Sequence, residues 1–213
     1  MQLQDYDIST QTKAKLLSSE KISPEATDVV RELIFEVDNE DFAPIAGQTV
    51  GILAPGQAEV GQEHHVRLYT VADLPDPTPG GGRKITLAVR RCTYIDEYSG
   101  ERYDGVASNY LCDLKPGEEI TMTGPYGLAF EVPHETDANL ILIGMGTGIA
   151  PFRAFVRHMH ENEKDFGGKI VLFHGGRTGL DLIYRNEEKD DFALYYDKPT
   201  FEAITALSAS PEW

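Results

Sequence analysis

The sequence predicts a two-domain β plus α/β protein, in which an antiparallel β-barrel of about six strands precedes a parallel-sheet domain. Over the first 130 or so residues, apolar and polar residues alternate in short runs that turn residues separate. After Pro133 the pattern changes to short continuous apolar runs, a glycine-rich turn and a helical repeat. We therefore predict one domain over residues 1–133 and a second over residues 134–213.

Strands of the first domain are recognised by a period of two, which gives each strand one buried face. Breakers lie between them at 41–44, 54–56, 75–82 and 115–117. This spacing favours a closed antiparallel barrel. The alternating positions are Leu33, Phe35 and Val37; Val50, Ile52 and Ala54; Val66, Leu68 and Thr70; and Ile85, Leu87 and Val89.

The second domain is predicted to begin as a strand–helix–strand–helix–strand unit, the first half of a doubly wound nucleotide-binding sheet. Its first strand is a continuous apolar run, which is typical of a parallel strand covered on both faces. The predicted strands are 140–143, 169–173 and 201–207. The predicted helices are one in which Phe152, Phe155, Val156 and Met159 recur at helical spacing, and one at about 181–192.

The bulk composition excludes several classes of protein. The 35 acidic residues exceed the 19 basic ones and give a net charge of −16, which argues against binding to nucleic acid. No apolar run reaches the roughly 18–20 residues of a membrane span, and the first residues do not resemble a secretory signal. Because the only two cysteines form neither a disulfide framework nor a metal cluster, we expect a cytoplasmic location.

The glycine-rich turn at 144–151 is the candidate nucleotide site. Gly146, Thr147 and Gly148 lie between a predicted strand and a predicted helix. There the backbone can approach a ligand closely, and the helix start favours an anion. The spacing differs from the usual dinucleotide fingerprint, and no acidic residue clearly ends the next strand. The residues alone leave two interpretations open, a nucleotide site and a tight turn without a ligand.

Arginine and aromatic residues in the first domain suggest a second site. Arg67 and Tyr69 share one face of a strand and suit a ligand with a phosphate and a flat ring, although an exposed strand face can carry such a pair incidentally. Arg90 and Tyr94 end a later strand. Residues 105–111 then look like a turn that enters a short helix, which Ser108 or Asn109 could cap.

Taken in order, these segments resemble the plant-type ferredoxin–NADP⁺ reductase family. The resemblance covers roughly residues 12 to 210 and is carried by Arg67-Leu68-Tyr69-Thr70, by Tyr94, by the run from Gly105 to Gly117, by the turn from Thr123 to Gly127, and by the glycine turn from Gly144 to Pro151.

The resemblance implies an FAD-binding barrel. Arg67 pairs with the pyrophosphate in this interpretation, while Tyr69 packs against the isoalloxazine ring and Thr70 places its hydroxyl near N5. Tyr94 stacks on the adenine, and Ser108 with the neighbouring amides holds the pyrophosphate. The full set implied for FAD is Arg67, Leu68, Tyr69, Thr70, Arg90, Tyr94, Gly105, Val106, Ala107 and Ser108.

The resemblance also implies that the second domain binds NAD(P)H, through Gly146, Thr147, Gly148, Arg177 and Ser208. Tyr69, Thr70 and Thr147 are the residues expected next to the reacting atoms. Hydride then passes between nicotinamide and flavin, and single electrons pass between the flavin and ferredoxin or another one-electron carrier.

The sequence departs from the family pattern in several places. The family continues with a further strand, helix and terminal aromatic residue, so we expect this chain to be a fragment. Ala209 stands where NADP-using relatives often have Arg, which leaves NADPH and NADH both open, with Arg177 either compensating or solvated. Ala107 replaces a common Cys. The acidic composition is unusual for a partner of acidic ferredoxin, although a local basic patch could still dock it: Arg83, Lys84, Arg90 and Arg91.

Two other functions remain open from the sequence. One is the reductase component of an oxygenase system, and the other is a flavin-binding subunit without independent catalysis. A metal site is not expected, because His64 and His65 face opposite sides of a strand, and His158 and His160 are not neighbours on a helix.

Overall fold

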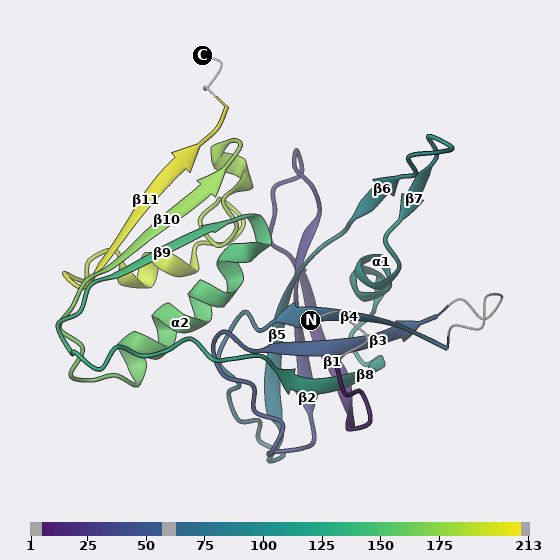
Figure 1. Cartoon of the computed structure of the whole chain (residues 1–213), viewed down its shortest axis with the longest axis horizontal. Helices are drawn as coiled ribbons and strands as arrows, with labels where there is room; N and C mark the ends of the chain where they lie inside the picture. Colours follow the sequence, from purple (N-terminus) through teal and green to yellow (C-terminus); the bar gives the residue numbers. More distant parts are fainter. Residues whose placement is uncertain (1–5, 57–62, 210–213) are drawn as a thin grey trace.

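The computed structural model describes residues 6–56 and 63–209. Figure 1 shows a β-barrel and, beside it, a small parallel sheet with a long helix against one of its faces. The barrel strands follow the order β4-β3-β8-β1-β2-β5, and each neighbouring pair is antiparallel. They are β1 (Gln11–Lys21), β2 (Val30–Val37), β3 (Thr49–Pro55), β4 (His64–Thr70), β5 (Arg83–Arg90) and β8 (Glu119–Tyr126).

The barrel closes just beyond the end of β4. Val71 bridges Leu87 of β5, and the Ala72 amide donates to the Thr86 carbonyl oxygen at 2.8 Å. The two outer strands of the sheet are therefore joined, which removes part of their free edges. The predicted six-stranded antiparallel barrel is confirmed.

Alternation along the strands predicts the barrel core correctly. Leu33, Phe35 and Val37 are fully buried, as are Val50 and Ile52 on β3. On β4, however, Val66 and Leu68 are only half-buried. Exceptions on the opposite faces of the strands include Glu32 of β2, which is only 3% exposed. It is buried because this face of β2 meets the second half of the chain, where Lys189 forms an ion pair with it.

A two-stranded ribbon and a short helix complete the first half. The ribbon pairs β6 (Thr93–Ile95) with β7 (Arg102–Asp104) and projects away from the barrel (Figure 1). Helix α1 (Val106–Asp113) follows and contacts β3, β4 and β5. The prediction that Ser108 or Asn109 caps this helix is wrong, because the helix begins one turn earlier and Gly105 is its N-cap.

The second half contains a parallel sheet in the order β11-β10-β9. Its strands are β9 (Leu140–Met145), β10 (Ile170–Gly176) and β11 (Phe201–Leu207), and helix α2 (Ala150–Glu161) follows β9. The helical spacing is confirmed, since Phe155, Val156 and Met159 are buried. The predicted boundary at 133/134 lies between the end of β8 and the start of β9.

The helix predicted at 181–192 is absent from this segment. Two short 3₁₀ turns, Gly179–Asp181 and Asp191–Tyr195, flank an irregular stretch. Leu182, Ile183 and Tyr184 are all buried, and three consecutive residues cannot share one narrow face of a helix. Tyr184 also has φ 61°, which a right-handed helix cannot accommodate. The prediction failed because the run is apolar without being helical in period.

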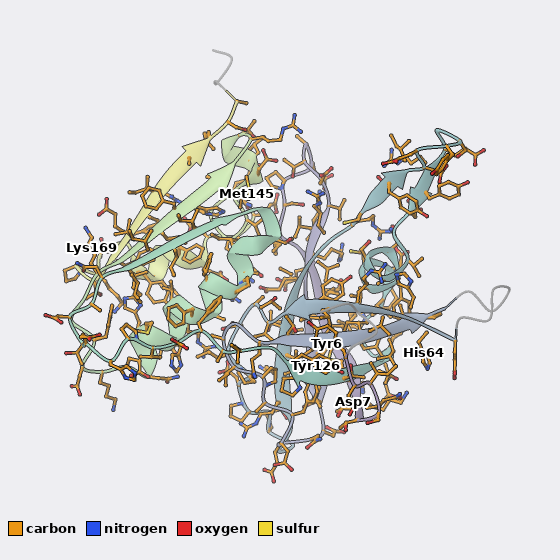
Figure 2. All side chains as sticks on the ribbon, viewed as in Figure 1. Tyr6, Asp7, His64, Tyr126, Met145 and Lys169 are labelled. Carbon is orange, nitrogen blue, oxygen red and sulfur yellow. The ribbon has the colours of Figure 1, made fainter. Side chains whose placement is uncertain are left out.

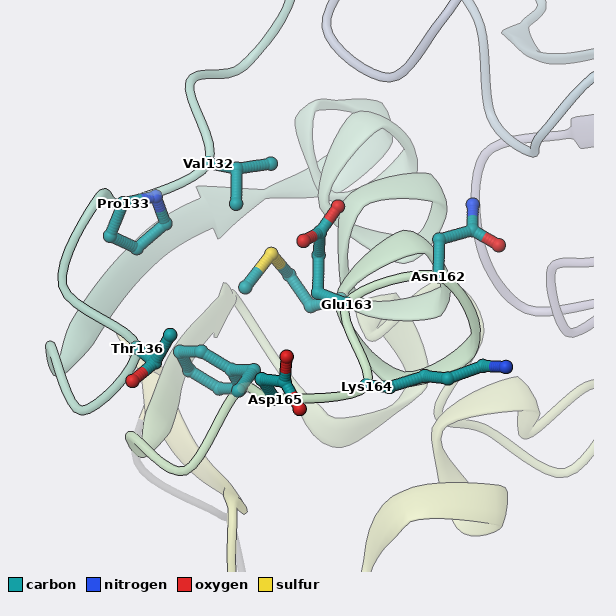
Figure 3. Close-up of a pocket in the computed structure, with 9 residues that line it drawn as sticks. Val132, Pro133, Thr136, Asn162, Glu163, Lys164 and Asp165 are labelled. Atoms are coloured by element: carbon teal, nitrogen blue, oxygen red, sulfur yellow. The ribbon is translucent and has the colours of Figure 1, made fainter.

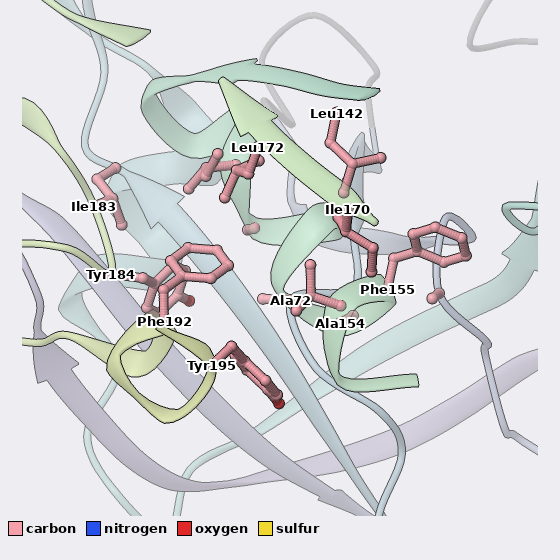
Figure 4. Close-up of a cluster of buried hydrophobic side chains, with 14 of the residues drawn as sticks. Ala72, Leu142, Ala154, Phe155, Ile170, Leu172, Ile183, Tyr184, Phe192 and Tyr195 are labelled. Atoms are coloured by element: carbon pink, nitrogen blue, oxygen red, sulfur yellow. The ribbon is translucent and has the colours of Figure 1, made fainter. Parts of the chain in front are cut away.

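The parallel sheet is covered on one face, so the prediction that its first strand is buried on both faces is wrong. Ile141, Ile143 and Met145 are 67%, 72% and 69% exposed, whereas Leu142 between them is buried. Both α2 and the irregular segment lie on the Leu142 side, in one cluster with residues of the barrel half (Figure 4). That cluster includes Ile22, Val30, Ala46 and Ala72 from the first half.

Among the described residues, neither helix combines the length and apolarity that crossing a bilayer would require.

Candidate functional site

Strand β4 carries the first group of candidate residues. The Arg67 side chain is exposed, and its Nη1 donates to the Val66 carbonyl oxygen at 2.8 Å. Leu68, Tyr69 and Thr70 are half-buried. Burial raises the pKa of Tyr69 to about 12, so its phenol stays neutral and can both donate and accept a hydrogen bond. A guanidinium and a phenol thus lie one strand repeat apart, as the sequence predicted.

The start of α1 offers backbone donors for an anion. The first amides of a helix have no partner within the helix, and this helix has neither a side-chain cap nor an acidic residue in its first turn. A Cβ on Gly105 would come within 2.9 Å of Ser108 Oγ and 3.1 Å of the Cys92 carbonyl oxygen. A larger residue at this position would crowd both atoms, and the amides of Val106, Ala107 and Ser108 follow the glycine.

The Ser108 hydroxyl is already used inside the loop. It accepts from the Cys92 amide at 3.1 Å and donates to the Gly105 carbonyl oxygen at 3.3 Å. Asn109 makes parallel contacts, since its Nδ2 donates to the carbonyl oxygens of Cys92 and Gly105. These hydrogen bonds attach α1 to the segment after β5. Because they occupy the side chains of Ser108 and Asn109, the backbone amides are the donors available to a phosphate.

The two arginines at the end of β5 differ in their partners. Arg91 donates to Asn109 at 2.7 Å and pairs with Asp113 at 2.5 Å, which commits it to α1. The Arg90 side chain is 55% exposed, and Asp28 lies 3.8 Å away. Of the basic patch predicted to dock an acidic partner, Arg91 is therefore a poor contributor, because its charge is matched by Asp113 within the fold.

Tyr94 lies on the projecting ribbon and does not stand alone. Its ring stacks on that of Tyr103 with centroids 5.6 Å apart, because the two residues are directly opposite in the β6–β7 pairing. Both rings remain substantially exposed. Sequence reasoning missed Tyr103, although hairpin pairing around residues 96–101 would have placed it opposite Tyr94.

The glycine turn leads from β9 into α2 as a 3₁₀ turn, Gly146–Ile149. Gly146 has φ 53°, and a Cβ on Gly146 or Gly148 would meet nothing within 4 Å. The backbone is thus open to a ligand here, whereas Gly144 is packed at 3.0 Å against the Phe152 ring. The turn also contacts barrel strand β5, so it lies at the junction of the two halves.

Arg177 and Ser208 are at the same edge of the parallel sheet as the glycine turn. They follow the carboxyl ends of β10 and β11, and both are exposed. The Ser208 amide donates to the Gly176 carbonyl oxygen at 3.0 Å, and the Ala209 amide to that of Arg177 at 2.9 Å. Figure 2 marks the two edges by Met145 at the carboxyl end of β9 and Lys169 just before β10. Nucleotides bind at the carboxyl edge of such sheets.

A cavity of about 350 Å³ lies elsewhere. Its lining includes Met159, Glu163, Lys164 and Phe166, at the carboxyl end of α2 (Figure 3). The glycine turn is at the opposite end of this helix. Because charged residues of both signs line the cavity and no candidate residue reaches it, we do not assign it to the site.

The structure therefore brings the predicted residues together in two groups. The first lies where β4, the end of β5 and the start of α1 meet, with Tyr94 farther out on the ribbon. The second lies along the carboxyl edge of the parallel sheet. The turn at Gly146–Ile149 links the groups through its contact with β5.

Comparison with known proteins gives a consistent result. Residues 142–212 match the model of the oxidoreductase NAD-binding domain. The ferredoxin–NADP reductase of the Cyanophora paradoxa cyanelle is 39% identical over 178 residues, which are 81% of this chain and 48% of that protein. The Spirulina enzyme of the same name is 37% identical over 178 residues, 81% of this chain and 60% of that protein. The chain spans about half the length of the curated relatives it matches.

Solved structures agree with this at the level of the fold. The ferredoxin–NADP⁺ reductase of Plasmodium falciparum with 2′P-AMP superimposes with a TM-score of 0.71, over 98% of this chain and 77% of that one, at 20% identity. The fold described above, a barrel followed by a parallel sheet, is thus shared with this structure.

Proposed function

We propose that the chain belongs to the ferredoxin–NADP reductase family, since relatives of that name that are 39% and 37% identical align with 81% of it, and that it is a flavoenzyme that moves electrons between NADPH and ferredoxin through FAD. The observation that carries the proposal is the open turn at Gly146 and Gly148, which starts α2 and contacts the barrel strand beside the β4 site. One bound group on each half would meet at this junction.

The residues of the barrel suit FAD. The Arg67 guanidinium and the amides of Val106, Ala107 and Ser108 hold the pyrophosphate, and no carboxylate in the first turn of α1 opposes it. Tyr69 packs against the flavin ring beside Thr70, and Tyr94 stacks on the adenine. Arg90 adds positive charge at the same end of the barrel. When bound, FAD supplies the redox chemistry by exchanging a hydride with nicotinamide and single electrons with a protein carrier.

The nucleotide binds along the carboxyl edge of the parallel sheet in this proposal. The backbone at Gly146 and Gly148 admits it, and Thr147 lies between them at the nicotinamide end. Arg177 and Ser208 are exposed on the same edge and suit the 2′-phosphate of NADPH. Because Ala209 provides no charge there, NADH remains the competing nucleotide.

The protein partner is a one-electron carrier, and ferredoxin is the one that the names of the relatives indicate. The net charge of −16 favours a second candidate function, the reductase component of an oxygenase system, because an acidic surface slows association with an acidic carrier. We place the protein in a reducing compartment such as the cytoplasm, since Cys92 and Cys112 are both free thiols.

The test is the visible absorbance of the purified chain after incubation with FAD, followed by anaerobic addition of NADPH and then of NADH. We expect flavin bands that bleach, faster with NADPH if Arg177 and Ser208 bind its 2′-phosphate. A chain that takes up no FAD would contradict the proposal. If FAD binds but neither NADPH nor NADH bleaches it, the proposed electron transfer is contradicted and only flavin binding is supported.

A further inference from the structure

A cluster of charged side chains fills the junction between the barrel and α2, and none of its members belongs to the proposed site. Arg153 is at its centre, with a side chain only 16% exposed. Its Nη1 donates to the Ala72 carbonyl oxygen at 2.9 Å and lies 3.1 Å from Asp73 Oδ2. Its Nε lies 2.5 Å from Asp191 Oδ2. One guanidinium therefore holds the segment after β4 and the segment after β10 together.

One buried and two half-buried carboxylates surround this guanidinium. Glu32 of β2 approaches Arg153 at 3.6 Å and forms a second ion pair with Lys189 at 2.5 Å. The guanidinium also lies over the Tyr184 ring, 4.8 Å from its centroid. A buried charge is tolerated only when it is paired and hydrogen-bonded. Arg153 is thus held by its hydrogen bond to Ala72 and by ion pairs with Glu32, Asp73 and Asp191, and a shift of α2 would separate it from these partners.

The position of Arg153 along the chain connects the two halves of the proposed site. It is six residues after Thr147, at the first full turn of α2, and its acceptor Ala72 is two residues after Thr70. Both anchors are joined directly to ordered elements of the fold. The Val71 and Ala72 amides donate to Gln48 and Thr86 of the barrel, and the turn at Gly146–Ile149 runs directly into α2.

We propose that Arg153 is a positioning residue that fixes the glycine turn relative to Tyr69 and Thr70, and so sets the approach of nicotinamide to flavin. This inference rests on the proposed function, but the arrangement of the two halves is measurable without any cofactor. Because hydride transfer depends steeply on the separation of the reacting atoms, a small displacement of α2 lowers the rate while binding of each cofactor persists.

The variants are R153K, which keeps the charge without the fork of donors, and R153Q, with K189Q as the matched control. Lys189 also bridges the two halves through Glu32, but it contacts neither α2 nor the segment after Thr70. K189Q therefore measures the effect of removing an ion pair between the two halves that does not involve α2. Circular dichroism and thermal unfolding verify that each variant is folded.

The first readout uses the apo chain. Spin labels on the exposed Cys92 and on an I143C substitution report the distance from the barrel to the strand that leads into the glycine turn. We expect R153K and R153Q to broaden or shift the distance distribution, and K189Q to leave it as in the wild type. An unchanged distribution in folded R153Q would overturn the inference.

The second readout is the rate of flavin reduction by NADPH in the FAD-loaded chain, measured over a range of nucleotide concentrations. We expect R153K to lower the limiting rate by about tenfold or more, with little change in the apparent dissociation constants for FAD and NADPH. An equal loss in K189Q, or a loss confined to nucleotide affinity, would overturn the positioning role. A wild type whose flavin is not reduced would refute the proposed function, whereas the distance measurement would still decide whether Arg153 fixes the arrangement.

Discussion

Strands β2 and β9 bury their apolar residues in different ways. In β2, Leu33, Phe35 and Val37 all point into the closed barrel and are fully buried. In β9, Leu142 is buried, whereas Ile141 and Ile143 on either side of it are mostly exposed. A closed barrel defines its inside by its own curvature, so alternation decides burial. An open parallel sheet has no inside of its own, so the burial of each face depends on which other segments pack against it.

The largest loss of stability is expected from a substitution in the buried core of β2. Phe35→Ala removes a fully buried ring from the barrel core and should lower the free energy of unfolding by about 3–5 kcal/mol. Ile143→Ala is the matched control on the exposed face of β9 and should cost under about 1 kcal/mol. Urea unfolding followed by circular dichroism measures both, and similar losses would contradict the different burial of the two strands.

The next effect is a pH dependence that belongs to the α/β half. Burial lowers the pKa of His174 to about 4, and among the described residues neither ring nitrogen has a hydrogen-bond partner. Because the unfolded chain binds this proton near its ordinary pKa of about 6.5, stability is fully present above that pH and is lost as the pH falls toward 4. The loss should be on the order of 2–3 kcal/mol.

His174→Phe should flatten the pH dependence between these two values, since the ring that resists protonation is gone. His64→Gln, on barrel strand β4, is the control and should keep the wild-type slope. Urea unfolding at a series of pH values distinguishes them. If both variants keep the wild-type slope, another group is responsible.

A smaller effect separates the two ends of the FAD site. Tyr94→Ala should weaken FAD by about 0.5–1.5 kcal/mol, the contribution of one aromatic stack, and leave FMN binding unchanged because FMN has no adenine. Tyr98→Ala, on the same ribbon with a fully exposed side chain, is the control. Fluorescence titration with both flavins provides the comparison, and an equal loss for FMN would place Tyr94 elsewhere in the site.

The smallest effect is expected on the open face of the sheet. Ile143→Lys should change the free energy of unfolding of this chain by less than about 0.5 kcal/mol, because the side chain is already 72% exposed. The measurement is again urea unfolding. A loss comparable to that of Phe35→Ala would show that this face is covered in solution.

The barrel and most of the site could be predicted from the sequence, and the reason is physical. Period-two alternation, glycine turns and β-strand positions are local properties, so the core of β2, the strand at 201–207 and the position of Arg67 beside Tyr69 could all be predicted. Non-local packing could not. The burial of Glu32, the open face of β9 and the Arg153 cluster depend on segments that are distant in the chain, such as Lys189 and Asp191.

Tyr184 illustrates a third limit. An apolar run of Leu182 to Tyr184 is compatible with a helix, a strand or an irregular buried segment, and composition does not distinguish them. Tyr184 is fully buried with a positive φ, and its ring packs against Arg153, a contact with a distant segment that no local pattern encodes.

The most direct test of the central claim is the affinity of the chain for FAD with and without the Arg67 charge. Arg67→Gln should weaken binding by about 1.5–3 kcal/mol, the contribution of hydrogen bonds to a charged phosphate, or roughly 10- to 100-fold. Arg83→Gln, at the opposite end of neighbouring strand β5, should leave the affinity unchanged. Equal affinities for wild type and Arg67→Gln, or no FAD binding at all, would contradict an FAD site built on β4 and α1.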